Sequence, residues 1–201
     1  MNEMPVGGIV LCGGRSTRMG TAKALLPFGP ETMLQRMVRL LSGIVSPIVV
    51  VAAGGQPLPD LPADVIVTRD EREGRGPLEG LRAGLKALPE HVEAAYVTSC
   101  DVPLLVPDFV RQMLDLARGH DVAVMEIEGF THPLSAVYRR ATLARVEELL
   151  AQDRLRPVFL YDAVNTRRVR PEEITADPEL RTLRNLNTPA DYQQALVDAG
   201  L

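Results

Sequence analysis

Uninterrupted apolar runs alternate with segments of helical periodicity along most of the chain. The runs that predict buried strands cover residues 6–12, 47–53, 65–68 and 94–99. Helical spacing of apolar residues covers 32–41, 107–117 and 139–152, begins at Gly76-Pro77 in another segment, and returns from Thr188-Pro189 to Gly200. Apolar strands separated by helices predict βαβ units with helices on both faces of a sheet. The expected fold class is therefore α/β, with a mostly parallel sheet between two helical layers.

Local signals predict where two of the helices begin and how one of them packs. Thr32 and Gln35 have the spacing of a capping box, and Gly43 is suited to end that helix. Gly80 and Gly84, four residues apart, leave one face of the next helix bare. Either another backbone or a flat nucleotide base could approach that face, and close helix packing is at least as plausible an explanation as ligand contact.

The second half of the chain predicts a hairpin and then loses its clear pattern. Glu128-Gly129 separates strand-like runs at 122–127 and 131–138, which predicts a hairpin and one antiparallel strand in a mixed sheet. The pattern weakens after residue 152, through 167–169, and residues 183–186 then resemble a short strand.

Composition restricts the function classes. The chain has 201 residues, 46% of them hydrophobic and 24% charged, which suits one globular domain over residues 1–201. A net charge of −4 argues against a nucleic-acid binder. We find no signal peptide and no apolar run near the roughly 20 residues of a membrane span, so we expect a cytoplasmic protein without a membrane partner. Cys12 and Cys100 lack zinc-site spacing and are interpreted as small core residues at strand ends.

The loop after the first strand carries candidate phosphate-binding chemistry. It reads Leu11-Cys12-Gly13-Gly14-Arg15-Ser16-Thr17-Arg18-Met19-Gly20, and Lys23 follows. Glycines allow close backbone approach, successive N–H groups can hold an anion, and three cations lie within nine residues. The loop fits neither the dinucleotide fingerprint nor the P-loop, so it predicts a phosphate cradle of a third kind. A solvated charged loop is the alternative.

Two aspartates follow predicted strands and could serve the same ligand. Asp101 comes directly after residues 94–99, and Asp70 comes after 65–68. Carboxylate and phosphate oxygens are the hard ligands that Mg²⁺ prefers, and Mg²⁺ usually takes only one or two carboxylates from the protein. Taken alone, an aspartate at a strand end is often a turn former. Together with the glycine-rich loop, Asp101 becomes a candidate metal ligand.

The order Leu11-x-Gly-Gly-x-Ser-x-Arg-Met-Gly-x-x-Lys resembles the signature of nucleotidyltransferases with a nucleotide-diphospho-sugar transferase fold. Within them the chain is most similar to the molybdenum cofactor guanylyltransferase family. Further matches are Cys100-Asp101-Val102-Pro103, Gly76-Pro77-Leu78-Glu79-Gly80, His132-Pro133 and Asn185-Leu186-Asn187-Thr188-Pro189. Cys12 stands where the family usually has alanine, which keeps the side chain small.

The resemblance implies a role for each matching position. Nucleotide binding would fall to Leu11, Cys12, Gly13, Gly14, Arg15, Lys23, Asp70, Gly76, Pro77 and Asp101. Arg18, Lys23 and Asp101 would be catalytic, with Asp101 as the Mg²⁺ ligand. His132, Asn185 and Asn187 would contact the second substrate. A lone histidine is more often structural, and Asn187 or Thr188 could instead cap the last helix.

The reaction implied is transfer of GMP from GTP to molybdopterin, with or without bound molybdenum, and release of pyrophosphate. Proteins that supply molybdopterin or mature molybdoenzymes would be possible partners. Residues 52–55 read Ala-Ala-Gly-Gly where the family often has an asparagine associated with the base, so guanine preference is the weaker expectation. The alternatives are CTP or another acceptor such as a sugar phosphate, and a nucleotide-binding regulator without catalysis.

Overall fold

The computed structural model describes residues 5–13, 22–70 and 74–201, and the fold over these residues is α/β. A central sheet carries, among the described residues, seven strands in the order β5-β4-β1-β6-β8-β7-β9. Their bounds are β1 Val6–Leu11, β4 Ile48–Ala52, β5 Ile66–Arg69, β6 Ala94–Ser99, β7 Val122–Ile127, β8 Phe130–Arg139 and β9 Thr166–Val169. Strand β8 runs antiparallel to both of its neighbours, and the other pairs are parallel. The expectation of a mostly parallel sheet with one antiparallel strand is confirmed.

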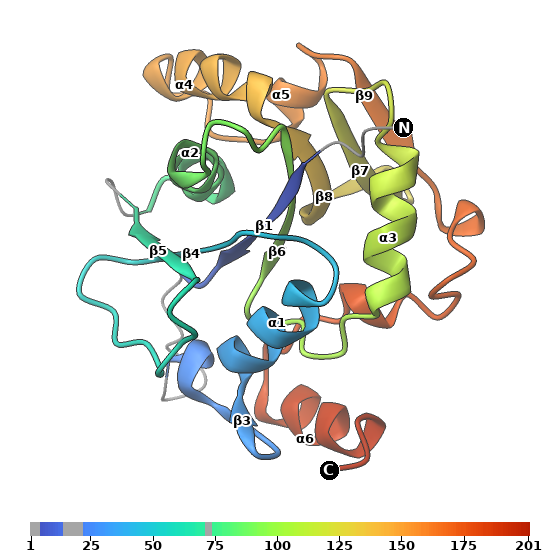
Figure 1. Cartoon of the computed structure of the whole chain (residues 1–201). Coiled ribbons are helices and arrows are strands. Elements are labelled where there is room, and N and C mark those ends of the chain that lie inside the picture. The colour runs from blue at the N-terminus through green and yellow to red at the C-terminus, as the bar shows by residue number, and fades with distance from the viewer. Residues whose placement is uncertain (1–4, 14–21, 71–73) are drawn as a thin grey trace.

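Helices cover both faces of this sheet (Figure 1). Helices α1 (Met33–Ser42) and α3 (Pro107–Leu116) pack on one face, where Val10, Val50 and Tyr96 belong to the same apolar cluster. Helices α2 (Pro77–Ala87), α4 (Leu143–Ala151) and α5 (Val158–Tyr161) pack on the other, with Ile9 and Val97. This confirms the three-layer α/β/α expectation. No helix within the described ranges has the length and apolar character to cross a bilayer.

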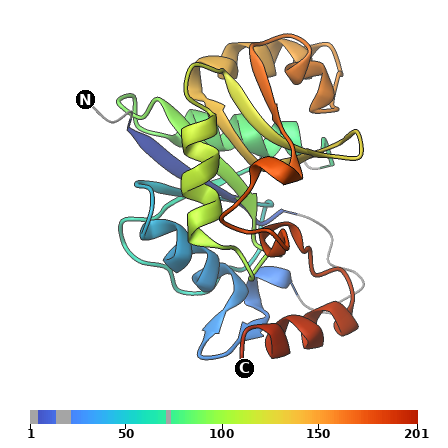
Figure 2. The ribbon, with the colours of Figure 1, turned by 90° about the vertical axis from the view of Figure 1, so that its right-hand side faces the viewer.

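A smaller apolar cluster brings the last helix together with residues from the first part of the chain. Helix α6 (Pro189–Asp198) packs near the short strands β2 (Pro27–Phe28) and β3 (Glu31–Thr32), at the end of the molecule where the C-terminus lies (Figure 2). Phe28 is fully buried there, and its ring meets that of Tyr192 edge to face at 6.5 Å. The last helix is thereby held beside residues that follow the first strand.

Helix α1 begins at the predicted capping box. The Thr32 hydroxyl accepts a hydrogen bond from the Gln35 N–H, and the Gln35 side chain accepts one from the Thr32 N–H. This satisfies two donors that a helix start leaves unpaired. Gly43 ends the helix, as expected.

Helix α2 begins at Pro77 and lies against strand β1 through its glycines. A Cβ placed on Gly84 would lie 2.6 Å from the Ile9 side chain, and one on Gly80 would lie 3.0 Å from Leu11. Both distances are too short for a normal carbon–carbon contact. Close packing of the helix on β1 therefore requires glycine at position 84. At position 80 the same packing strongly favours glycine.

Two predicted elements differ from the structure. Residues 139–152 do not form one helix, because Arg139 ends β8 and a 3₁₀ turn, η2 (Arg140–Thr142), precedes α4. The predicted strand at 183–186 is wrong. A 3₁₀ turn, η4 (Arg181–Leu183), ends there, and the next backbone hydrogen bond runs from the Leu186 N–H to the carbonyl of Asp101. Arg184 is extended, but the segment joins a loop rather than the sheet.

Other short elements have no counterpart in the sequence prediction. They are β2, β3, α5, β9 and the 3₁₀ turns η1 (Lys23–Leu25) and η3 (Pro171–Glu173). The hairpin at Glu128-Gly129 was predicted and is present, with positive φ angles of 50° and 81° that a tight turn of this kind needs.

Candidate active site

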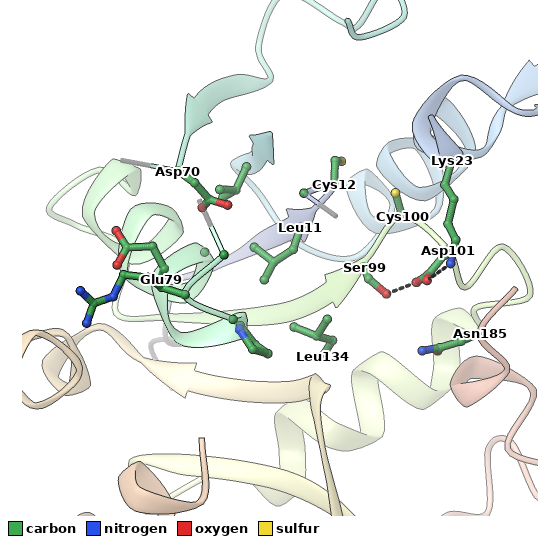
Figure 3. A pocket seen from close by; sticks show the side chains of 17 residues that line it. Leu11, Cys12, Lys23, Asp70, Glu79, Ser99, Cys100, Asp101, Leu134 and Asn185 are labelled. Carbon is green, nitrogen blue, oxygen red and sulfur yellow. Dashed lines mark hydrogen bonds and ion pairs between the residues drawn. The ribbon is translucent and has the colours of Figure 1, made fainter. Parts of the chain in front are cut away.

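A cavity of about 510 Å³ opens at the carboxyl ends of β1, β5 and β6. Open α/β sheets bind ligands at this edge because the strand-end loops converge there. Figure 3 shows the lining side chains, with Lys23 and Asp101 at one end and Asp70 and Glu79 at the other. The lining residues are Leu11, Cys12, Gly13, Lys23, Val51, Asp70, Gly74, Arg75, Gly76, Pro77, Glu79, Gly80, Ser99, Cys100, Asp101, Leu134 and Asn185.

Lys23 and Asp101 form an ion pair at the first end of the cavity. The Lys23 Nζ lies 2.8 Å from Asp101 Oδ2, and the two side chains are 18% and 16% exposed. The Ser99 hydroxyl donates to the other oxygen of the same carboxylate (Figure 3). The Lys23 ammonium also donates to Asn187 Oδ1 at 3.2 Å. The carboxylate is therefore fixed in orientation while part of it still faces the cavity.

The residues around Asp101 can be compared with what a magnesium ion requires of a protein site. Mg²⁺ is usually bound by one or two carboxylates, waters and the phosphates of its substrate, rather than by a cage of protein ligands. The described residues contain no group of three His, Cys, Asp or Glu that could hold a metal. The Asp101 carboxylate already faces a cation, the Lys23 ammonium, in a cavity with room for phosphate oxygens. One carboxylate in such a place is compatible with a divalent cation that is held together with the phosphates of a substrate.

Asp70 lies at the other end of the cavity, beside the start of the glycine-rich loop. Its N–H donates to the Ala52 carbonyl at 3.0 Å, which ties the end of β5 to that of β4. A Cβ on Gly13 would lie 3.1 Å from Asp70 Oδ2, so glycine allows these two residues to approach closely. Gly76 and Pro77 line the same end, and Gly76 has a φ of +72° that favours glycine.

Cys12 and Cys100 lie at the ends of the neighbouring strands β1 and β6, as the sequence predicts. Both are buried, with exposures of 6% and 4%. A hydrogen bond with Cys100, and then burial, raise the pKa of the Cys12 thiol well above its ordinary value. The thiol is therefore neutral at physiological pH, and both cysteines act as small packing residues in the cavity wall.

The three candidates for the second substrate do not lie together. Asn185 lines the cavity and Asn187 contacts Lys23, so both lie near Asp101. His132 lies on β8, half-buried, and does not belong to the cavity lining; burial lowers its pKa. The cap of α6 is Thr188, whose hydroxyl accepts from the Asp191 N–H, so capping does not account for Asn187.

Two charged residues line the cavity that sequence reasoning did not single out. Arg75 donates to the Leu150 carbonyl at 2.6 Å and to Asp153 at 3.1 Å, which joins its loop to the end of α4. Glu79 is only 3% exposed and accepts from Arg82 at 2.6 Å. Their signal was available, because each is a charged residue inside a glycine-rich motif. Three other candidates, Gly14, Arg15 and Arg18, lie outside the described residues.

Comparisons with known proteins show the family to which the chain belongs. The model of the MobA-like NTP transferase domain matches residues 8–168, most of the chain. The chain belongs to the MobA-like NTP transferase family. A relative from Mycobacterium avium, described as "Probable molybdenum cofactor guanylyltransferase", is 38% identical over 196 residues, which cover 96% of this chain and 95% of the relative.

Solved structures of MobA-like and related proteins share the fold. Molybdopterin-guanine dinucleotide biosynthesis protein A from Archaeoglobus fulgidus superposes with a TM-score of 0.78 at 20% identity, covering 96% of this chain and 98% of the other. A cytidylyltransferase from Leptospira borgpetersenii superposes with a TM-score of 0.69 at 18% identity, covering 96% and 86%. The nucleotide-diphospho-sugar transferase-like fold is thus established. At these identities a shared fold does not indicate which nucleoside triphosphate the chain binds.

Proposed function

We propose that this protein transfers GMP from GTP to molybdopterin and releases pyrophosphate. The observation that carries the proposal is the Lys23–Asp101 pair at the strand-end cavity, in a chain of the MobA-like family. The relative from Mycobacterium avium supports the choice of substrates through its name. Cytoplasmic location, and contact with proteins that supply molybdopterin or mature molybdoenzymes, belong to the same proposal.

The reaction needs charge stabilisation more than proton transfer. The terminal phosphate of molybdopterin is already an anion at neutral pH, so it can attack the α-phosphorus without a general base. The site has to offset repulsion between two anions and stabilise the departing pyrophosphate, which fixed cations and N–H donors do in other phosphoryl transfers. Lys23 would donate to phosphate oxygens. Asp101 would hold Mg²⁺, which neutralises phosphate charge when it is bound.

The two ends of the cavity would bind different parts of the nucleotide. The triphosphate would lie at the Lys23–Asp101 end, and the nucleoside would lie toward Asp70, Gly76 and Pro77. Leu11, Cys12 and Gly13 form the wall between these ends. Asn185 and Asn187, beside Lys23, would contact the second substrate together with His132. Gly14, Arg15 and Arg18 keep their roles as phosphate-binding and catalytic candidates on sequence grounds.

A second candidate uses the same chemistry with CTP or with a different acceptor, such as a sugar phosphate. It is favoured by one feature, the Ala52-Ala53-Gly54-Gly55 segment where the family often has an asparagine. A nucleotide-binding regulator without catalysis is the third. The intact Lys23–Asp101 pair counts against the regulator, because a binding protein has no need to retain the catalytic ion pair.

The test is a transfer assay with each α-³²P-labelled nucleoside triphosphate, Mg²⁺ and molybdopterin. We expect the label to move to the pterin from GTP and pyrophosphate to appear in equal amount. Transfer from CTP alone, or to a sugar phosphate alone, would establish the second candidate. Nucleotide binding with no pyrophosphate release under any combination would establish the regulator. Omission of the divalent cation, and its replacement by Mn²⁺, determine the metal requirement.

A further inference from the structure

Gln56 joins the ends of two strands beside the cavity, although it does not line the cavity itself. Its Oε1 accepts a hydrogen bond from the Ala53 N–H at 3.1 Å, and its Nε2 donates to the Cys12 carbonyl at 3.1 Å. One side-chain amide thus bridges the Ala52–Ala53 peptide at the end of β4 and the Cys12–Gly13 peptide after β1. The turn that carries Gln56 is braced separately, because Arg69 donates to the Ala53 carbonyl at 2.7 Å.

These bonds determine which way the Gly13 N–H points. Along β1 the peptides alternate: the Leu11 carbonyl accepts from Cys100 on the β6 side, and the Cys12 N–H donates to Val51 on the β4 side. The Cys12 carbonyl then turns to the β4 side, where Gln56 holds it. A trans peptide is planar, with its C=O and N–H in opposite directions. The Gly13 N–H therefore faces the β6 side, where Asp101 lies.

The Gly13 N–H is suited to a ligand rather than to the sheet. The pairing of β1 with β6 ends at Leu11 and Ser99. Within the described ranges no backbone acceptor takes the Gly13 N–H. Gly13 lines the cavity, so this donor lies at the border of the space in which the triphosphate would bind.

We propose that Gln56 is a positioning residue that holds the Cys12–Gly13 peptide with its N–H directed at a phosphate group bound beside Asp101. The inference rests on the proposed function for the identity of the nucleotide, but its chemistry requires only a magnesium-bound polyphosphate. Without the amide, the peptide is free to rotate, and a donor that was aimed in advance has to be ordered when the ligand binds.

Two variants separate positioning from simple bracing. Gln56→Met keeps the length of the side chain and removes both hydrogen bonds. Gln56→Glu keeps an acceptor for Ala53 but places a carboxylate against the Cys12 carbonyl. Gln112 supplies a matched control, because its amide also bridges two backbone groups, those of Glu173 and Thr175, and none of these residues lines the cavity. Gln112→Met therefore shows how much the loss of a bridging amide outside the cavity lining changes the affinity for the probes.

The probes are magnesium tripolyphosphate, which has no base, and guanosine, which has no phosphate. By calorimetry we expect both Gln56 variants to bind magnesium tripolyphosphate about tenfold more weakly, because the Gly13 N–H then has to be ordered when the ligand binds. Guanosine affinity should stay within about twofold in the same variants, since no phosphate contact is involved. Gln112→Met should bind both probes as the wild type does. With ¹⁵N-glycine labelling, the Gly13 amide resonance should shift when tripolyphosphate binds to the wild type and shift less in Gln56→Met.

Each outcome decides the proposal. Unchanged tripolyphosphate affinity in both Gln56 variants, an equal loss for guanosine, or failure of the wild-type protein to bind magnesium tripolyphosphate would overturn it. If the wild-type protein binds magnesium tripolyphosphate more tightly than the Gln56 variants but transfers no nucleotide, the proposed function is refuted and the role of Gln56 is supported. In active enzyme, Gln56→Met should raise KM for GTP about tenfold and leave kcat within about threefold, as expected for lost uniform binding.

Discussion

The Lys23 ammonium and the Asp101 carboxylate lie 2.8 Å apart, although 78 positions separate them in the chain. A bound phosphate would compete with Asp101 for the Lys23 ammonium. A bound metal cation would compete with Lys23 for the Asp101 carboxylate. The pair holds both groups in place before substrate arrives. Binding of metal and nucleotide together would exchange one ion pair for two.

Replacing Asp101 tests the proposed metal ligand. Asp101→Asn keeps the shape of the side chain and removes the negative charge; its amide oxygen can still accept from Lys23, while its NH₂ group would donate to the Ser99 hydroxyl. Loss of one such electrostatic group typically costs ~3–4 kcal/mol of transition-state stabilisation, so turnover should fall by at least about two orders of magnitude. Thermal unfolding should stay near that of the wild type. Asp108→Asn, at the exposed start of α3, is the control. Near-normal pyrophosphate release in Asp101→Asn would refute the assignment.

Replacing Lys23 should affect metal and nucleotide in opposite directions. In Lys23→Met the cation that competes for Asp101 is gone, so Mn²⁺ binding measured by electron paramagnetic resonance should be as tight as in the wild type or tighter. Affinity for GTP should fall about tenfold or more, because a charge-assisted hydrogen bond to phosphate is lost. Lys86→Met, on the exposed side of α2, should change neither. Weaker Mn²⁺ binding in Lys23→Met would contradict the competition.

Gly84 gives a test of the fold that is independent of the site. Gly84→Ala should improve helix propensity by about 1 kcal/mol, yet its Cβ would lie 2.6 Å from Ile9, and overpacking costs typically 1–3 kcal/mol. We expect a net loss in the free energy of unfolding, measured with urea. In an Ile9→Ala background the same substitution should be neutral or stabilising. A stabilising effect of Gly84→Ala in the wild-type background would show that the close packing is not required.

His132 predicts a particular pH dependence of stability. Burial lowers the pKa of its imidazole from the ordinary 6.5, so below about pH 6.5 the unfolded chain binds more protons than the folded one. The free energy of unfolding then falls as the pH falls through the interval between the two pKa values. His132→Gln should lose less stability than the wild type between pH 7 and about pH 5. His91→Gln, at an exposed position, should behave as the wild type does, and equal profiles for all three proteins would refute the effect.

The strongest sequence predictions concern elements whose pattern is local. The apolar runs of β1, β4 and β6 are buried in full or nearly so, and the capping box of α1 and the turn at Glu128-Gly129 have the expected geometry. Asp101 and Lys23 were chosen separately from two motifs, and they meet in the structure because parallel strands deliver their following loops to one edge of the sheet. Topology thus converts two local signals into one site.

The failures occur where long-range contacts decide the conformation. Residues 183–186 have the composition of a strand, but the donor of Leu186 is taken by the carbonyl of Asp101, which no local pattern specifies. Strand β9 is rich in arginine and is formed because it pairs with β7. The Gln56 bridge depends on how two loop ends face each other, so it is invisible before the sheet is assembled.

The hydrogen bond from Leu186 to Asp101 also bears on when the protein can first work. It brings the segment with Asn185 and Asn187 against residues that emerge from the ribosome well before it. A nascent chain can assemble β1, β4 and β6 early, since domains begin to fold during synthesis. It cannot bring these asparagines to Lys23 until residues 185–187 have also been synthesised, so the contacts proposed for the second substrate form only after the sheet edge is already in place.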